Sequence, residues 1–132
     1  MNPDIKAAWL EALRSGRYTQ GKNVLRTYDD RYCCLGVLCD LHSKATGTKW
    51  DKNSQFCYEY EEAEGVLPHS VVSWAELDGD LLYYDDPDTE FCTVAVTIGQ
   101  ESHRRDDLAL LNDRGESFEM IADLIEAYIP VR

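Results

Sequence analysis

Basic residues are scarce in this chain of 132 residues, which holds 13 Lys and Arg against 25 Asp and Glu for a formal net charge of -12. A protein that binds a nucleic acid polymer neutralises many phosphates and needs a broad basic surface. The charge balance therefore argues against nucleic acid polymers as partners. A small anion bound by a local group of cations is still compatible with it.

Long hydrophobic runs are also lacking. No stretch approaches the ~18 consecutive apolar residues of a membrane span, and residues 1–4 lack the basic and apolar regions of a signal peptide. We therefore expect no membrane partner and a cytoplasmic location. The hydrophobic share of 44% and the aromatic share of 11% suffice for a core, and the length fits one domain over residues 1–132.

The cysteine content fits no disulfide framework, because the five cysteines are an odd number and lie in apolar surroundings. In a reducing compartment such residues behave as small hydrophobic side chains, so we expect buried free thiols. A zinc site of Cys34, Cys39 and His42 is the alternative, although their spacing matches no common ligand pattern. We expect no metal and no other cofactor.

Hydrophobic periodicity, caps and helix-stopping residues predict five short helices. Their expected ranges are 3–15, 31–43, 68–77, 108–112 and 118–129. The second range is apolar on nearly every side, which indicates a central helix and leaves a buried strand as the alternative. Gly36 within it indicates the close approach of another backbone.

Alternating apolar residues predict strands over residues 55–60 and a hairpin formed by 81–84 and 91–98, with Pro87 in its connection. The expected fold is therefore α+β, with the helices packed on a small antiparallel sheet or hairpin. No strand-helix-strand repeat suggests a doubly wound nucleotide-binding fold. The aromatic strand at 56–60 also offers a surface on which a homo-oligomer could form.

The last two predicted helices resemble a helix-turn-helix in spacing. The second of them carries Glu119, Asp123 and Glu126 and no basic residue, so phosphates would repel it. We do not expect it to read DNA.

The charges divide unevenly along the chain. Residues 1–52 hold nine Lys and Arg against six Asp and Glu, a net charge of +3, whereas residues 53–132 hold four against nineteen, a net of -15. Within the first part, the segment "GRYTQGKNVLR" (16–26) has no apolar period. It is a basic, glycine-punctuated loop between two predicted helices.

This loop is the candidate ligand-binding site. Its cations can supply charge-assisted hydrogen bonds, Gly21 lets a ligand approach the backbone, and a tyrosine offers a stacking face. The spacing is not that of a P-loop. The predicted binding residues are Arg17, Tyr18, Gln20, Lys22 and Arg26. In the alternative interpretation these cations pair with the acidic second part of the same chain.

Signals for catalysis are weak. The chain has three histidines, His42, His69 and His103, and none lies in a glycine-flanked elbow or a recognised cysteine-enzyme signature. The acidic runs 59–64 and 85–90 are typical of solvated surface. A small hydrolase is thus the third choice, and we expect no catalytic residues.

Four segments together resemble a family of small uncharacterised bacteriophage proteins. They are "WLEALRSGRYTQGKNVLR", "YCCLGVLCDL", "LPHSVVSWAEL" and "LALLNDRGESFEMIADLIE", in this order. In that family a glycine often stands at the position of Glu76. The resemblance carries no catalytic residues over to this chain.

The resemblance implies a phage accessory protein that acts in the host cytoplasm, plausibly against host defence. The function expected from it is non-enzymatic: binding and sequestering a small phosphorylated ligand such as a nucleotide signal. The alternative is an acidic inhibitor that mimics DNA and docks on a basic host protein.

Overall fold

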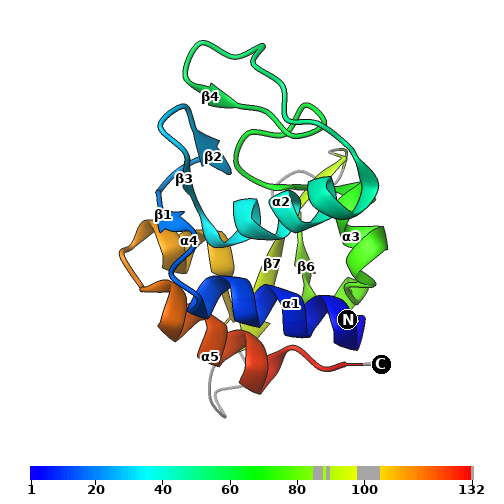
Figure 1. Cartoon of the computed structure of the whole chain (residues 1–132). Coiled ribbons are helices and arrows are strands. Elements are labelled where there is room, and N and C mark those ends of the chain that lie inside the picture. The colour runs from blue at the N-terminus through cyan, green and yellow to red at the C-terminus, as the bar shows by residue number, and fades with distance from the viewer. Residues whose placement is uncertain (85–87, 89, 98–104, 132) are drawn as a thin grey trace.

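The computed structural model describes residues 1–84, 88, 90–97 and 105–131 (Figure 1). Five α-helices and one short 3-10 helix, at Gly79–Leu81, occur within these residues. The α-helices are α1 (Pro3–Arg14), α2 (Cys34–Thr46), α3 (His69–Ala75), α4 (Leu108–Asp113) and α5 (Phe118–Tyr128). The predicted α+β class is confirmed. No helix in this described part is both long enough and apolar enough to cross a bilayer.

The strands form two small sheets. The first has the order β1 (Thr19–Gln20), β3 (Arg31–Tyr32), β2 (Arg26–Thr27) and β4 (Cys57–Tyr58). The second is built on β7 (Phe91–Thr97), which pairs with β5 (Leu67–Pro68), β6 (Leu82–Tyr83) and β8 (Arg105–Asp107). The second sheet is antiparallel as predicted, whereas β1 and β3 of the first run parallel.

Two strand predictions have different outcomes. The predicted hairpin is present as β6 and β7, with Leu82 opposite Val94; Pro87 and Ile98 lie outside the described residues. The predicted strand over 55–60 is wrong in its extent, because only Cys57–Tyr58 pair as β4 and Phe56 is 82% exposed. The alternation of aromatic and other residues over 55–60 does not mark one buried strand face, because Glu59 and Tyr60 pair separately with Asp51 and Ala63.

The helices enclose a single hydrophobic core. In Figure 1, α2 crosses the middle of the molecule and α1 and α5 lie side by side below it, while β2 and β4 lie above α2 and β1 and β3 lie at its left end. Trp9 of α1 is fully buried, and its indole N–H donates to the carbonyl of Cys34 at 3.0 Å. The N-terminal amine donates to the carbonyl of Pro130 at 3.0 Å, which joins the two ends of the chain.

The central helix α2 starts later than predicted, because Arg31 and Tyr32 pair as β3. Cys33 caps it, its sulfur accepting the N–H of Gly36 at 3.4 Å. All five cysteines are free and buried, as predicted. Because Cys34–Thr46 is helical, the alternative of a buried strand is excluded for all of this region except Arg31–Tyr32.

Gly36 is where the preceding loop meets α2. A Cβ at this position would lie 1.8 Å from the carbonyl oxygen of Leu25 and 2.7 Å from its carbonyl carbon. Leu25 itself is fully buried, and its carbonyl accepts the N–H of Cys33 at 3.2 Å. The predicted close approach of a backbone at Gly36 is confirmed, and only glycine fits there.

His42 is buried in α2 at 5% exposure. Its Nδ1 lies 2.5 Å from the hydroxyl of Tyr60, and its ring meets that of Trp74 edge to face. Burial lowers the pKa of His42 below its usual value, and the negative charge of Glu61 opposes this shift without reversing it. The neutral imidazole is therefore the form that the fold accommodates.

The mutation Gly36→Ala should lower the free energy of unfolding by at least about 3 kcal/mol, because the added methyl group clashes with backbone rather than a movable side chain. Gly79→Ala is the matched control, since nothing lies within 4 Å of its Cβ position. Urea denaturation of both variants measures the difference. A Gly36→Ala protein within about 1 kcal/mol of the wild type would contradict the packing described here.

Acidification should destabilise the protein through His42. The unfolded chain takes up the proton near pH 6.5 and the folded chain only at lower pH, so this stability is complete above 6.5 and lost as pH falls through the folded pKa. Urea denaturation at pH 7.5 and 5.5 should show a larger loss for the wild type than for His42→Gln. His69→Gln, at an exposed site, is the control for loss of a histidine elsewhere. Equal losses in the wild type and His42→Gln would refute the assignment.

Candidate ligand-binding pocket

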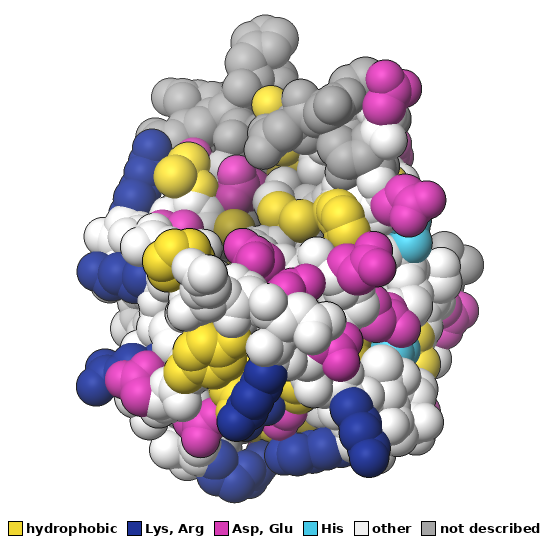
Figure 2. Space-filling model, turned by 90° about the horizontal axis from the view of Figure 1, so that it is seen from above, with side chains coloured by type: hydrophobic (Ala, Val, Ile, Leu, Met, Phe, Trp, Pro, Cys, Tyr) yellow, Lys and Arg dark blue, Asp and Glu magenta, His cyan; other side chains and the backbone are white. Residues whose placement is uncertain are grey.

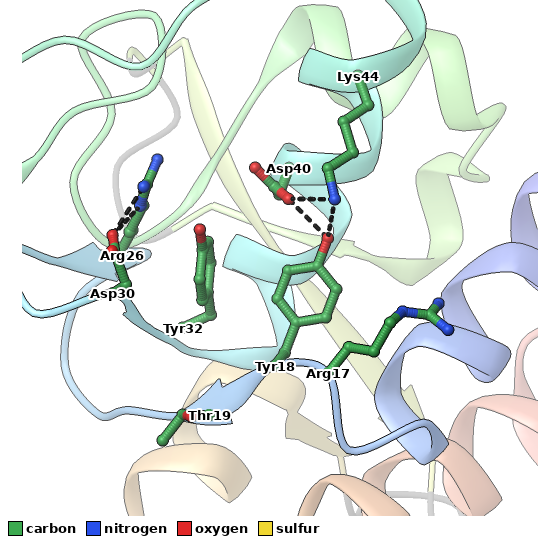
Figure 3. A pocket seen from close by; sticks show the side chains of 8 residues that line it. All are labelled: Arg17, Tyr18, Thr19, Arg26, Asp30, Tyr32, Asp40 and Lys44. Atoms are coloured by element: carbon green, nitrogen blue, oxygen red, sulfur yellow. Dashed lines mark hydrogen bonds and ion pairs between the residues drawn. The ribbon is translucent and has the colours of Figure 1, made fainter.

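A cavity of about 450 Å³ opens to the surface between the first sheet and α2. Its walls carry cationic, aromatic and acidic side chains (Figure 3). The lining residues are Arg17, Tyr18, Thr19, Arg26, Asp30, Tyr32, Asp40 and Lys44.

The loop and the helix supply opposite walls of this pocket. Tyr18 precedes β1 and Tyr32 ends β3, and the parallel pairing of these strands brings their rings edge to face at 5.0 Å. Asp40 and Lys44 are four residues apart on α2, so both side chains reach the same side of the helix. The Leu25–Gly36 contact holds the loop against α2 and thus sets the distance between the walls.

Asp40 connects the loop wall with the helix wall. Its side chain is 11% exposed and accepts hydrogen bonds from the Tyr18 hydroxyl at 2.6 Å and the Trp50 indole at 3.1 Å. Lys44 lies 3.3 Å from the same carboxylate and donates to the Tyr18 hydroxyl at 3.2 Å. Burial, with the bond to Asp40, raises the pKa of Tyr18. Asp40 thus has three partners, and its carboxylate holds the Tyr18, Trp50 and Lys44 side chains in position.

Arg26 occupies an aromatic cage. Its guanidinium carbon lies 4.1 Å from the ring centre of Tyr58, 5.3 Å from that of Tyr32 and 5.4 Å from that of Trp50. Its Nε and Nη2 both donate to one carboxylate oxygen of Asp30, at 3.0 and 2.7 Å. Cation–π contacts at partly buried sites stabilise the position of such a group.

Tyr32 is the tyrosine at the base of this arrangement. Burial and the nearby negative charge of Asp40 raise its pKa to about 12, although the positive charge of Arg26 acts in the other direction. Tyr32 therefore lines the pocket as a neutral ring at physiological pH rather than as a phenolate.

Three of the predicted ligand-binding residues, Arg17, Tyr18 and Arg26, line the cavity. Gln20 and Lys22 are not among the lining residues. The amide of Gln20 donates to Asn112 at 2.8 Å and to the carbonyl of Glu116 at 2.7 Å. Lys22 is exposed, and its amine lies beside Gly115. The two residues instead face the turn between α4 and α5, because the loop bends at β1.

Two cations of the loop, Arg17 and Arg26, pair with nearby carboxylates rather than with the acidic second part of the chain. Arg17 bonds to Glu11 of α1, where both side chains are 60% exposed, and Arg26 bonds to Asp30. Figure 2 shows Lys and Arg side chains mainly along the left and lower edges and Asp and Glu side chains mainly across the middle and the right, with a few acidic side chains among the basic ones. The pocket lining carries three cations against two carboxylates, so the pocket is locally cationic in an acidic protein.

Sequence reasoning missed the helix wall of the site. Asp40 and Lys44 lie in and just after an apolar segment, and their spacing of four residues on a helix was the available signal. Asn112 was missed as well. It is fully buried in α4, accepts from Gln20 at 2.8 Å, and donates to the carbonyl of Gly21 at 2.8 Å.

The alternative zinc site has no support in the described residues. No group of three or more His, Cys, Asp or Glu side chains in residues 1–84, 88, 90–97 and 105–131 could hold a metal ion. The sulfur of Cys34 donates to the carbonyl of Leu108 at 3.4 Å, and His42 is engaged with Tyr60. His42 and His69 are not among the lining residues of the pocket, and His103 lies outside the described residues.

Replacing Asn112 with Ala should destabilise the protein by about 2 kcal/mol, because buried backbone groups of Gly21 and Cys34 lose their partner. Gln20→Ala removes only the half-buried partner of Asn112 and should cost less than half as much. Thermal or urea unfolding compares the two. Similar losses would show that Asn112 does not fasten the loop.

Comparison with known proteins gives a family but no relative of known activity. No curated protein and no solved structure matches the chain. One family profile, described as a domain of unknown function (DUF8296), matches residues 1–129. Because this match covers nearly the whole length, the chain belongs to the DUF8296 family.

Proposed function

We propose that this protein binds a small phosphorylated ligand with an aromatic ring, such as a nucleotide, in the pocket between the first sheet and α2. The observation that carries the proposal is the lining of the cavity. Three cations, Arg17, Arg26 and Lys44, and two tyrosine rings surround about 450 Å³ of open space in a protein of net charge -12. Pockets for small ligands have volumes of about 300–1,000 Å³.

The chemistry of the walls suits both parts of a nucleotide. Guanidinium and ammonium groups donate charge-assisted hydrogen bonds to phosphate oxygens, and aromatic rings stack on bases with little dependence on sequence. The ion pair of Arg17 with Glu11 is exposed on both sides, and exposed pairs contribute little to stability. A phosphate can therefore replace the Glu11 carboxylate at small cost, and the Asp30 carboxylate beside Arg26 is itself 61% exposed.

The lining favours binding over catalysis. A nucleophile needs a general base within hydrogen-bond reach, and the buried carboxylate of the pocket, Asp40, already accepts bonds from two donors besides its lysine. Its role is then to hold the walls in place. Together with the resemblance to bacteriophage proteins, this supports sequestration of a host nucleotide signal as the biological role.

A thermal-shift panel of linear and cyclic nucleotides tests the proposal. A ligand at one hundred times its Kd should raise the free energy of unfolding by about 2.7 kcal/mol and the melting temperature with it. Arg26→Gln should abolish the shift. Arg31→Gln is the matched control, because Arg31 is 55% exposed, pairs with Asp29 and lies outside the lining.

A second pair of variants guards against a structural effect of losing Arg26 from its aromatic cage. Lys44→Gln should weaken binding at least about tenfold, and Lys49→Gln, exposed and outside the lining, should not. A melting temperature unmoved by every nucleotide would refute the proposal and favour the acidic inhibitor. Equal effects of the pocket variants and their controls would also refute it.

A further inference from the structure

We infer that the guanidinium edge of Arg26 is the phosphate-binding group of the pocket and that the carboxylate of Asp30 is a built-in competitor for this edge. The inference deepens the proposed function and rests on it. In this inference the phosphate of the ligand binds to Arg26, and Asp30 lowers the affinity of the pocket for that phosphate.

The position of Arg26 does not depend on Asp30. Its side chain is only 18% exposed, and the rings of Tyr58, Tyr32 and Trp50 lie 4.1 to 5.4 Å from the guanidinium carbon. Two of these rings are held without Asp30, since the Trp50 indole donates to Asp40 and Tyr58 lies in β4, where its backbone pairs with that of Arg26. The guanidinium therefore keeps its orientation when its acidic partner changes.

The Nε and Nη2 edge of Arg26 is engaged by a single oxygen. Nε and Nη2 converge on the Oδ1 atom of Asp30, and both residues line the pocket. Arginine binds phosphate through the same pair of donors, so a phosphate oxygen and this carboxylate oxygen exclude each other. Figure 3 shows this pair at one side of the cavity, with Lys44 and Tyr18 at the other.

Asp30 is poorly fixed compared with Arg26. Its side chain is 61% exposed, and it ends the tight turn between β2 and β3 with its N–H bonded to Thr27 at 3.0 Å. Its φ of 61° lies in the left-handed region, which Asp and Asn tolerate better than most residues. The Asp30 carboxylate on this turn can rotate into solvent when a phosphate binds to Arg26. Because it stays attached beside Arg26, it continues to compete with the phosphate for the Nε and Nη2 donors.

Asp30→Asn tests this competition. Asn keeps the size of the side chain and tolerates the same backbone conformation, but it removes the negative charge. Asp29→Asn is a close control, because it changes the net charge equally, one residue away, and its partner Arg31 lies outside the lining. Any general effect of net charge on anion binding is thereby subtracted.

The probe is inorganic pyrophosphate, titrated at low salt while the side-chain Nε–H signal of Arg26 is followed by NMR and identified with Arg26→Gln. We expect saturable binding in the wild type, a Kd about tenfold lower in Asp30→Asn, and less than about a twofold change in Asp29→Asn. Equal Kd values in the two variants would overturn the inference. So would an Arg26 signal that pyrophosphate does not move.

Running the nucleotide panel on the same proteins separates the two ideas. Tighter pyrophosphate binding by Asp30→Asn without any effect of nucleotides would support the Arg26–Asp30 competition and refute the proposed ligand class. Nucleotide binding that is equal in wild type, Asp30→Asn and Asp29→Asn would support the proposed function and overturn the competition.

Discussion

The contact between the backbone of Leu25 and Gly36 of α2 is the constraint on which the pocket depends. A Cβ at Gly36 would lie 1.8 Å from the Leu25 carbonyl oxygen, so the loop and the helix touch at backbone level. The N–H of Leu25 donates to the carbonyl of Glu64 at 2.6 Å, which adds the segment after β4 to the same point. Two short strands and a loop, too small to be stable alone, are thereby fastened to the buried centre of the molecule.

Once the loop is fastened, electrostatics determine what the space beside it can bind. Asp40, nearly buried, joins Tyr18, Trp50 and Lys44, while three rings hold Arg26. The carboxylates that pair with Arg17 and Arg26 come from α1 and the β2–β3 turn, not from the strongly acidic second part of the chain. Local pairing of this kind leaves the cations near solvent, where an external anion can reach them.

The helices and part of the site could be predicted because their signals are local. Asn2 does cap α1, where its side chain accepts the N–H groups of Asp4 and Ile5. Glu76 ends α3 with a φ of 55°, in the left-handed region that commonly terminates helices. Arg17, Tyr18 and Arg26 followed from composition in a loop that lacks apolar periodicity.

The rest depends on contacts that periodicity does not encode. The two-residue strands β1 and β3 pair in parallel, Gly36 admits the backbone of Leu25, and the Gln20 amide donates to Asn112. Asp40 and Lys44 lie in the C-terminal half of α2. The apolar sequence of this helix predicted a role in the core and gave no indication of a binding site. The NMR signal of the Trp50 indole N–H, which donates to Asp40 at 3.1 Å, reports most directly on this site. Titration with a ligand that stabilises the protein should shift this signal saturably and leave the buried Trp9 indole unchanged, whereas an unmoved Trp50 signal would place the ligand elsewhere and contradict the account.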